Sequence, residues 1–446
     1  MSAEVDDPRA AFVDATFWHG SKTRADQILA AHPEIVGSDI YLAATLGDAD
    51  AVQRFIAADP ASATTKGGPR NVDALTYLCF STYLRDDRTR TEGFVRAATA
   101  LLDAGADAST GFHDPTHRPE PEWESAIYGA AGVAQHPELT KLLIDRGADP
   151  NDEETPYHSP ETWDNDALKI LVESGKLTAQ SLETMLLRKA DWHDGEGIKY
   201  LLTHGADPNR MSRWHHTAMH QALRRDNAVE NIAAFLDAGA DPLLASRADA
   251  RSSVSIAARR GRKDVLDTFE RRGHSIELRG VERLIAACAR NDAGTIAQVT
   301  AAEPALIADL LAEGHTLLAE FSGTGNVDGV RQLLDLGVPV DAIYGGDPYF
   351  GIPRNSTALH VAAWKAAPKV VSLLIDRGAA VNVVDGNGRT PLALAVRACV
   401  DSYWSSRRSP ESTAALLRAG AHVDGVNFPS GYRDVDELLE PHMKTG

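Results

Sequence analysis

Histidines, which serve proteins as bases, proton carriers and metal ligands near neutral pH, are concentrated in one short stretch of this chain. Residues 212–220 read SRWHHTAMH and hold His215, His216 and His220 beside Trp214. This density is compatible with a metal site or with a catalytic base. The elements that surround the stretch determine whether it performs chemistry or belongs to the architecture.

A second pair, His113 and His117, has the four-residue spacing of metal ligands on a helix. Pro115 lies between the two histidines, so we expect a loop in which both rings need not face one ion. Zinc normally needs three or four converging ligands, and Asp114 is the further acid beside this pair. We therefore predict no metal ligands, and a weak metal site in this loop stays an alternative.

The motifs of common enzyme classes are incomplete. HGSKT at 19–23 lacks the first glycine of a phosphate-binding loop. GTGNVDG at 323–329 has the wrong glycine intervals for a dinucleotide fingerprint. The sequence contains no G-x-S-x-G, no H-E-x-x-H and no Cys/His pair. We therefore expect no catalytic residues and no cofactor.

Composition and charge restrict the class of partner. The 446 residues are 43% hydrophobic and 24% charged, which is typical of a folded chain. The net charge of -18 would repel a phosphate backbone and argues against nucleic acid as the main partner. Between Asp107 and Asp166, fourteen acids face three bases, a net of -11. This acidic band predicts a protein partner with a basic patch.

The cysteines and the N-terminal residues indicate the compartment. Cys79, Cys288 and Cys399 each lie in an apolar pattern far from one another, so we expect buried thiols and no disulfide framework. The start, MSAEVDDPRA, is acidic where a signal peptide is basic, and no apolar run is long enough to span a membrane. We expect a cytoplasmic protein without membrane contact.

A repeated motif organises the whole chain. Paired apolar residues, two polar residues, a glycine and then Asp or Asn recur, as in LLDAGADAS, LLTHGADPN and LLIDRGAAVN. The repeated glycines are Gly105, Gly147, Gly175, Gly205, Gly239, Gly273, Gly337, Gly378 and Gly420. One interval, from Gly273 to Gly337, is about twice as long as its neighbours and fits two units.

The pattern resembles the ankyrin repeat, whose unit of about 33 residues contains two antiparallel helices and a turn. T-x-L-H-x-A and L-L-x-x-G-A-x-x-N occur together at 357–382, and the resemblance covers roughly residues 39–424. It implies an all-α solenoid of about ten to eleven units with long finger loops between repeats. We expect a helical capping unit at 1–37, a repeat array at 38–425 and a C-terminal cap at 426–446. Whether the array is continuous or kinked near Gly175 and Gly314 stays open.

Threonine and proline mark the helix starts. Thr217, Thr357 and Thr390 can cap free backbone N–H groups, and Pro391 follows at a position where its missing N–H costs nothing. The resemblance assigns His220 and His360, each three residues after such a threonine, to hydrogen bonds of the scaffold. His220 is therefore predicted to be architectural.

Aromatic, histidine and acidic residues fill the connections between repeats. TGFHDPTHRPEPEWES, NDEETPYHSPETWDND, SRWHHT and IYGGDPYFGIPRNS are expected to be fingers on one edge, where insertions often mark the binding face. Their predicted partner-binding residues are Phe112, His113, Trp123, Tyr157, His158, Trp163, Trp214, His215, His216, Tyr344, Tyr349 and Phe350. In the alternative interpretation these rings pack the fingers onto neighbouring helices. Trp192 is expected on the opposite edge.

These observations favour a non-catalytic scaffold or adaptor that binds a protein through its concave face and fingers. The alternative is a receptor for a small ligand or a metal ion, in which the fingers close over the bound species. The sequence leaves the identity of the partner, the pathway and the oligomeric state open.

Overall fold

Helices form nearly all the regular structure of this computed structural model, which describes residues 7–117 and 119–443. Contacts divide the chain into two compact units, and the boundary falls around helix α15 (Val229–Asp237). Unit 1 contains residues 1–225 and 237–240, and unit 2 contains residues 226–236 and 241–446. The expected boundaries at residues 37 and 425 stay predictions.

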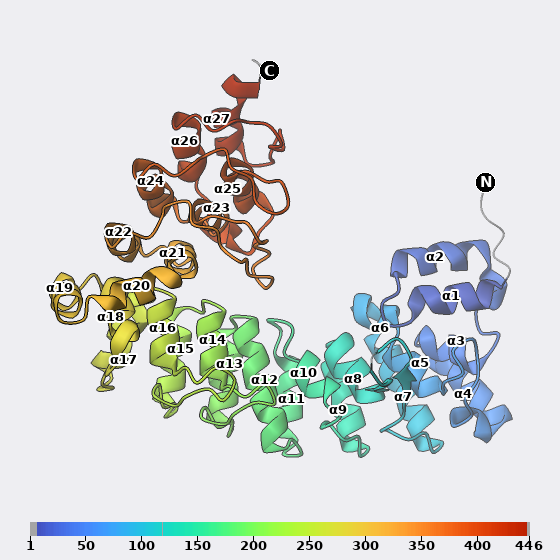
Figure 1. The fold of residues 1–446 in the computed structure, drawn as a ribbon. Coiled ribbons are helices and arrows are strands. Elements are labelled where there is room, and N and C mark those ends of the chain that lie inside the picture. The colour runs from blue at the N-terminus through green and yellow to red at the C-terminus, as the bar shows by residue number, and fades with distance from the viewer. Residues whose placement is uncertain (1–6, 118, 444–446) are drawn as a thin grey trace. The chain divides into compact units, whose positions relative to one another are not determined.

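Unit 1 consists of helix pairs joined by turns (Figure 1). The helices are α1 (Pro8–Thr16), α2 (Lys22–Ala31), α3 (Ile40–Thr45), α4 (Ala49–Ala58), α5 (Ala74–Cys79), α6 (Thr82–Asp86), α7 (Thr91–Asp103), α8 (Ala126–Tyr128), α9 (Pro137–Asp145), α10 (Glu154–His158), α11 (Asp166–Glu173), α12 (Ala179–Asp191), α13 (Gly195–Thr203) and α14 (Ala218–Arg224). Short 3-10 helices lie at Pro33–Ile35, Pro60–Ala63 and Arg88–Arg90, and a π-helical turn at Gly129–Val133 continues α8.

Unit 2 repeats the same plan after α15. Its helices are α16 (Ser253–Arg259), α17 (Lys263–Arg271), α18 (Gly280–Arg290), α19 (Ala293–Ala302), α20 (Ala305–Ala312), α21 (Gly314–Gly323), α22 (Val327–Asp335), α23 (Ala358–Trp364), α24 (Pro368–Asp376), α25 (Pro391–Val400), α26 (Glu411–Arg418) and α27 (Arg433–Met443), with a 3-10 helix at Tyr403–Arg407. Among the described residues no single helix is long and apolar enough to cross a bilayer, and α19 and α20 meet that test only as a pair bent by 113°.

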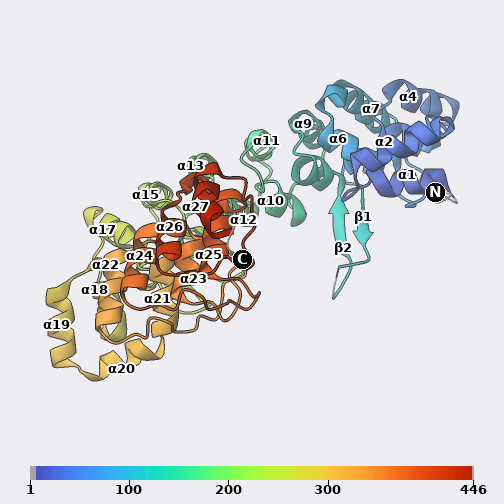
Figure 2. The same ribbon diagram turned by 90° about the horizontal axis from the view of Figure 1, so that it is seen from above.

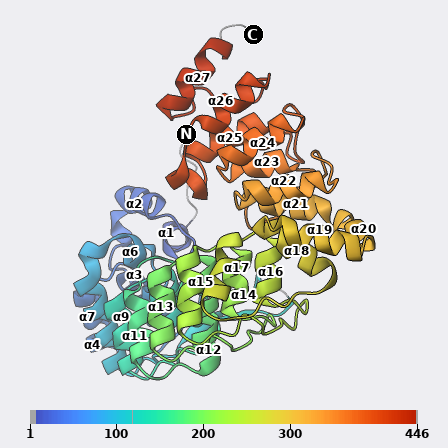
Figure 3. The same ribbon diagram turned by 90° about the vertical axis from the view of Figure 1, so that its left-hand side faces the viewer.

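The helices of each unit form two layers. The first helices of successive repeats pack against each other, as α3 with α5, α12 with α14 and α23 with α25. The second helices do the same, as α4 with α7 and α24 with α26, and Figure 3 shows α21 to α26 stacked in this way. Because each helix buries its apolar face against the neighbouring repeat, the predicted all-α repeat architecture is confirmed.

The expected helix starts and ends are confirmed. Thr217 and Thr357 form capping boxes with His220 and His360, and the Thr390 side chain accepts a hydrogen bond from the backbone N of Ala393. All nine repeat glycines have φ between 67° and 103°, the left-handed conformation that ends a helix. The three cysteines are buried thiols, as expected.

The stacking changes at Gly314. Helix α18 packs against α16 and α22, and α21 makes contacts with α16 and α23. A Cβ atom at Gly314 would lie 2.9 Å from Val338, so this glycine permits a close approach of the chain. At Gly175, in contrast, the first-helix layer continues because α10 packs against α12. The regular stacking is therefore interrupted near Gly314 and maintained past Gly175.

Candidate functional site

The finger that follows α7 is a β-hairpin where the sequence led us to expect a loop. Strands β1 (Gly111–Asp114) and β2 (Glu122–Ser125) pair antiparallel, and Figure 2 shows the hairpin projecting from the helices of unit 1. The register places His113 opposite Trp123, with ring centroids 4.8 Å apart. His113 is exposed and Trp123 half-buried.

The other face of the hairpin carries Phe112, Asp114, Glu122 and Glu124, because side chains alternate along a strand. The Phe112 ring packs among Phe17, Trp18 and Phe80, at centroid distances of 5.3, 5.6 and 5.1 Å. Phe112 therefore fastens the hairpin to the core of unit 1, and because its side chain is half-buried its role as a partner contact stays a prediction.

Carboxyl groups gather between this face and α10. Glu154 raises the pKa of the neighbouring Glu122 carboxyl, and Glu154 accepts a hydrogen bond from Nε2 of His158 at 3.1 Å. Nδ1 of His158 donates to Glu161 at 2.7 Å. Burial alone would lower the pKa of His158, but its bonds to Glu154 and Glu161 raise that pKa to about 9. His158 is therefore an imidazolium fixed by two carboxylates.

Aromatic rings and guanidinium groups connect the next two fingers. The rings of Tyr157 and Trp214 lie 6.0 Å apart. The guanidinium of Arg213 lies 4.6 Å from the centroid of Trp214 and 5.8 Å from that of Tyr157. The guanidinium of Arg188 lies 4.1 Å from the centroid of Tyr157. Tyr157, His158 and Trp214 are termed the finger surface below; all three side chains are half-buried.

The histidines of the 212–220 stretch divide into two kinds. His220 is buried, and its Nδ1 lies 2.7 Å from the Thr217 hydroxyl, so its predicted structural role is confirmed. His216 Nε2 lies 3.0 Å from the Gln221 side chain, and burial lowers the pKa of this ring. His215 is exposed, with a φ of 65° at the tip of the turn. Their density reflects a capped helix start and a tight turn.

Trp163 lies apart from the finger surface. It is 62% exposed, and its ring centroid lies 5.0 Å from that of Trp192. Both residues lie in connections between the two helices of a repeat, α10–α11 and α12–α13. The ammonium of fully buried Lys189 donates to the backbone oxygen of Thr162 at 2.6 Å and holds this loop. Trp163 was expected with the fingers, but its ring contacts Trp192, which was expected on the opposite edge. The expected placement of Trp163 is therefore wrong.

The finger before α23 in unit 2 folds onto its own helices. Tyr344 is 7% exposed and donates to Glu320 at 3.1 Å, while Phe350 is 9% exposed and lies 5.9 Å from Trp404. These two rings are core residues, which corrects their prediction as partner contacts. Tyr349 is 40% exposed and stays a candidate.

A buried ionic network lies beneath that finger. Arg260 bonds Asp226 at 2.7 Å and Glu320 at 2.9 Å, and Lys365 also bonds Asp226. The Lys365 ammonium lies 3.6 Å from the centroid of the Phe350 ring. Burial opposes ionisation of Asp226, but the charges of Arg260 and Lys365 hold its pKa well below the usual range. Sequence reasoning missed this network because its members lie far apart along the chain.

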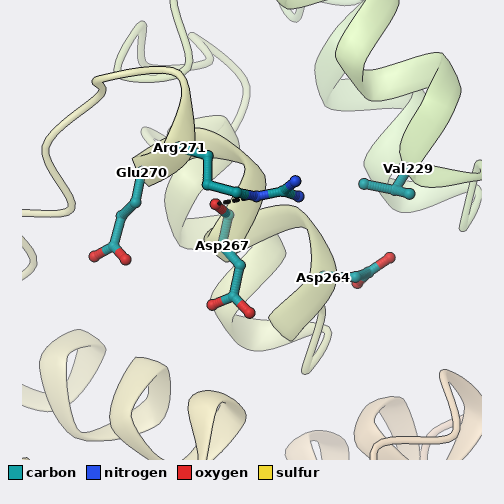
Figure 4. A pocket seen from close by; sticks show the side chains of 5 residues that line it. All are labelled: Val229, Asp264, Asp267, Glu270 and Arg271. Atoms are coloured by element: carbon teal, nitrogen blue, oxygen red, sulfur yellow. Dashed lines mark hydrogen bonds between the residues drawn. The ribbon is translucent and has the colours of Figure 1, made fainter.

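Unit 2 also has a surface pocket, which Figure 4 shows beside α17. Asp264, Asp267, Glu270 and Arg271 line it from α17, and Val229 lines it from α15. Cations of the chain itself pair with these carboxylates: Arg262 with Asp264, Lys263 with Asp267 and Arg290 with Glu270. The three carboxylates that line this pocket are therefore already paired with cations of the chain. Within 7–117 and 119–443, no three His, Cys, Asp or Glu side chains are grouped so as to hold a metal ion.

Comparison with known families agrees with the repeat structure. Residues 351–395, which include the capping box of Thr357 and His360, match the family model of ankyrin repeats in many copies. The segment 351–395 is therefore similar to ankyrin repeats. Repeats of this family are typically non-catalytic and generally mediate protein–protein interactions.

Similar proteins include a plant kinase and a human repeat domain. This chain is 37% identical over 84 residues to serine/threonine-protein kinase 12 of Arabidopsis thaliana, a match that covers 19% of this chain and 17% of the kinase. Such a short match does not extend the kinase's activity to this chain. The crystal structure of the human ASB11 ankyrin repeat domain is 22% identical, with a TM-score of 0.23, over 52% of this chain and 96% of that domain.

Proposed function

We propose that this repeat protein is a non-catalytic scaffold that binds a protein partner through the finger surface of unit 1. The observation that supports this most is the contact between fingers: the Arg213 guanidinium lies beside the rings of both Tyr157 and Trp214. Half-buried aromatic rings held in place by such contacts are typical interface anchors. In unit 2, by contrast, the long finger packs its rings into its own core.

The charge around this surface suggests the kind of partner. The hairpin and α10 belong to the segment from Asp107 to Asp166 with its net of -11. A partner with a basic patch would gain electrostatic attraction and a faster encounter. The partner proposed here is therefore a protein whose contact surface carries arginine or lysine.

Affinity capture from the native cell extract tests this proposal. We expect the wild-type chain to retain a protein that the double variant Tyr157→Ala/Trp214→Ala loses, because both rings lie on the finger surface. Tyr403→Ala is the matched control, since Tyr403 is a 53% exposed aromatic residue of unit 2. Circular dichroism must show the same helical signal for all three proteins. Retention of the same proteins by the double variant would refute a role for this surface.

A further inference from the structure

Trp163 is the most exposed large hydrophobic residue in the part of the chain that the structure describes, at 62% exposure. Its ring forms a T-shaped contact with the half-buried ring of Trp192, with centroids 5.0 Å apart. The two tryptophans lie in the connections between α10 and α11 and between α12 and α13. The tryptophan loops are defined here as residues 159–166 and 191–196. Tryptophan is among the residues that most often anchor a protein interface.

The loop that carries Trp163 is held by buried polar groups. The ammonium of Lys189, which is 0% exposed, donates to the backbone oxygen of Thr162 at 2.6 Å and to Asp194 at 2.8 Å. The amide of Asn165 donates to the same carboxylate at 2.8 Å and to the backbone oxygen of Trp163 at 3.4 Å. These bonds fix the peptide groups on both sides of Trp163. The exposed indole is therefore positioned before a partner arrives, which reduces the entropy lost on binding.

The tryptophan loops are negatively charged. They contain six acids and no lysine or arginine. Two of the acids, Asp164 and Glu196, are exposed and have no ion-pair partner within residues 7–117 and 119–443. The other four are paired with cations of neighbouring segments: Glu161 with Arg188, Asp166 with Lys169, Asp191 with Arg225 and Asp194 with Lys189. A cationic partner would therefore meet one unpaired carboxylate in each loop.

Other tryptophans of this chain lie against guanidinium groups. An arginine guanidinium lies 4.6 Å from the centroid of Trp214, 5.4 Å from that of Trp364 and 4.3 Å from that of Trp404. No cation of the described residues lies over the ring of Trp163 or Trp192. A guanidinium is attracted to the face of tryptophan and also stacks on it through its flat shape. The exposed Trp163 ring is therefore suited to the same contact with a guanidinium from outside the chain.

We propose that the tryptophan loops are a second interaction surface, which binds an arginine side chain from a basic segment of a protein partner. The guanidinium stacks on the Trp163 ring, and Asp164 and Glu196 provide the opposing charge. The surface goes beyond the finger surface, because the tryptophan loops join the two helices of a repeat whereas the fingers join successive repeats. The charge of the loops favours a basic segment over a second copy of this chain, whose net charge of -18 would repel the first.

Fluorine NMR of the full chain labelled with 5-fluorotryptophan tests the proposal. The spectra of Trp163→Phe and Trp192→Phe identify the loop signals among those of the seven tryptophans. The probe is an acetylated, amidated peptide of alternating arginine and glycine, and its control has neutral citrulline in place of arginine. We expect the arginine peptide to shift the Trp163 signal more than those of tryptophans outside the loops, and the citrulline peptide to leave it in place. An unchanged Trp163 signal at saturating arginine peptide, or an equal shift with citrulline, overturns the proposal.

Calorimetric titration with the same peptide measures the contribution of each group. Trp163→Ala should weaken binding about fivefold, and Asp164→Asn about threefold. The matched controls, which should bind as wild type does, are Tyr403→Ala, which removes a 53% exposed ring of unit 2, and Asp145→Asn, which removes the same charge from an exposed helix position. Equal affinity of the two aromatic variants, or of the two charge variants, would mean that the peptide responds only to net charge and would overturn the proposal.

Sedimentation velocity of wild type and Trp163→Ala tests the other occupant. We expect both proteins to sediment alike. A wild-type dimer that the substitution dissociates would place a second copy of the chain on the tryptophan loops, and would overturn the basic segment as their occupant.

This proposal and the proposed function can fail separately. If Tyr157→Ala/Trp214→Ala loses a captured protein while the peptide leaves the Trp163 signal in place, the finger surface is used and the role of the tryptophan loops is wrong. If the peptide shifts the Trp163 signal while capture is unaffected by the finger substitutions, the tryptophan loops bind a basic segment and the proposed finger contacts are wrong.

Discussion

At the residue scale, burial decides the protonation of several side chains. His360 is 1% exposed and contacts the backbone oxygens of Val383 and Arg389, each at 3.1 Å. Burial lowers its pKa, so the ring stays neutral and serves the scaffold. Glu124 shows the opposite case for a carboxyl group, because it keeps its proton when buried. Burial thus favours the neutral form of both residues: the His360 ring stays unprotonated, and the Glu124 carboxyl keeps its proton.

The proton on Glu124 predicts a pH dependence of stability. Its pKa is about 8 in the folded chain, above the ordinary 4.5, so the folded state binds more protons than the unfolded state between these values. The contribution of Glu124 is therefore fully present below about pH 4.5 and is lost as the pH rises to about 8. Because glutamine is neutral throughout, Glu124→Gln should be more stable than wild type by on the order of 3 kcal/mol at pH 8 and nearly equal to it at pH 4.

Thermal unfolding monitored by circular dichroism at pH 4, 6 and 8 measures this difference. Asp145→Asn serves as the control, because Asp145 is exposed and pairs with Lys141 on the helix surface. A melting-temperature difference between Glu124→Gln and wild type that does not grow with pH contradicts the assigned proton.

At the element scale, fingers of similar composition differ in which side chains they bury. The hairpin of unit 1 buries Phe112 and leaves His113 exposed on the opposite face. The finger before α23 buries Tyr344 and Phe350 above Lys365, and the indole of Trp364 donates to the Phe350 backbone oxygen at 2.7 Å. In the first finger, successive side chains of the strand point to opposite faces of the hairpin. The second finger instead lies along its own helices.

This difference predicts contrasting effects of two neighbouring substitutions. Phe350→Ala removes a 9% exposed ring that covers the Lys365 ammonium, so it should lower the free energy of unfolding by about 3–5 kcal/mol. Tyr349→Ala removes a 40% exposed ring and should change that free energy by less than about 1 kcal/mol. Urea denaturation followed by circular dichroism compares the two. Equal, small effects would mean that the finger is not part of the core.

At the scale of the whole molecule, the repeats determine how stability is distributed, and the net charge determines which macromolecules are attracted. Each repeat buries its apolar face only against its neighbours, so stability is a sum of local interfaces. The net charge of -18 repels acidic macromolecules and attracts basic ones. The acidic band concentrates this effect on the hairpin and α10 of unit 1.

The charge predicts a salt-dependent association. Once a partner has been captured, its association rate should fall by at least about tenfold between 0.05 and 0.5 M NaCl, because mobile ions screen the acidic band. The dissociation rate should change much less. Stopped-flow or surface-based kinetics measures both rates, and potassium glutamate in place of chloride controls for a specific effect of the anion. An association rate that is independent of salt contradicts a basic partner surface.

The sequence by itself determined the repeat plan of this protein. Thr217, Thr357 and the repeat glycines act within a few residues of their own positions, because helix capping and left-handed turns are local chemistry. The tertiary structure decided which aromatic side chains remain accessible and which carboxyl groups meet. Trp163 lies against Trp192, and Glu154 lies against Glu122, because packing between repeats joins residues that no local spacing relates.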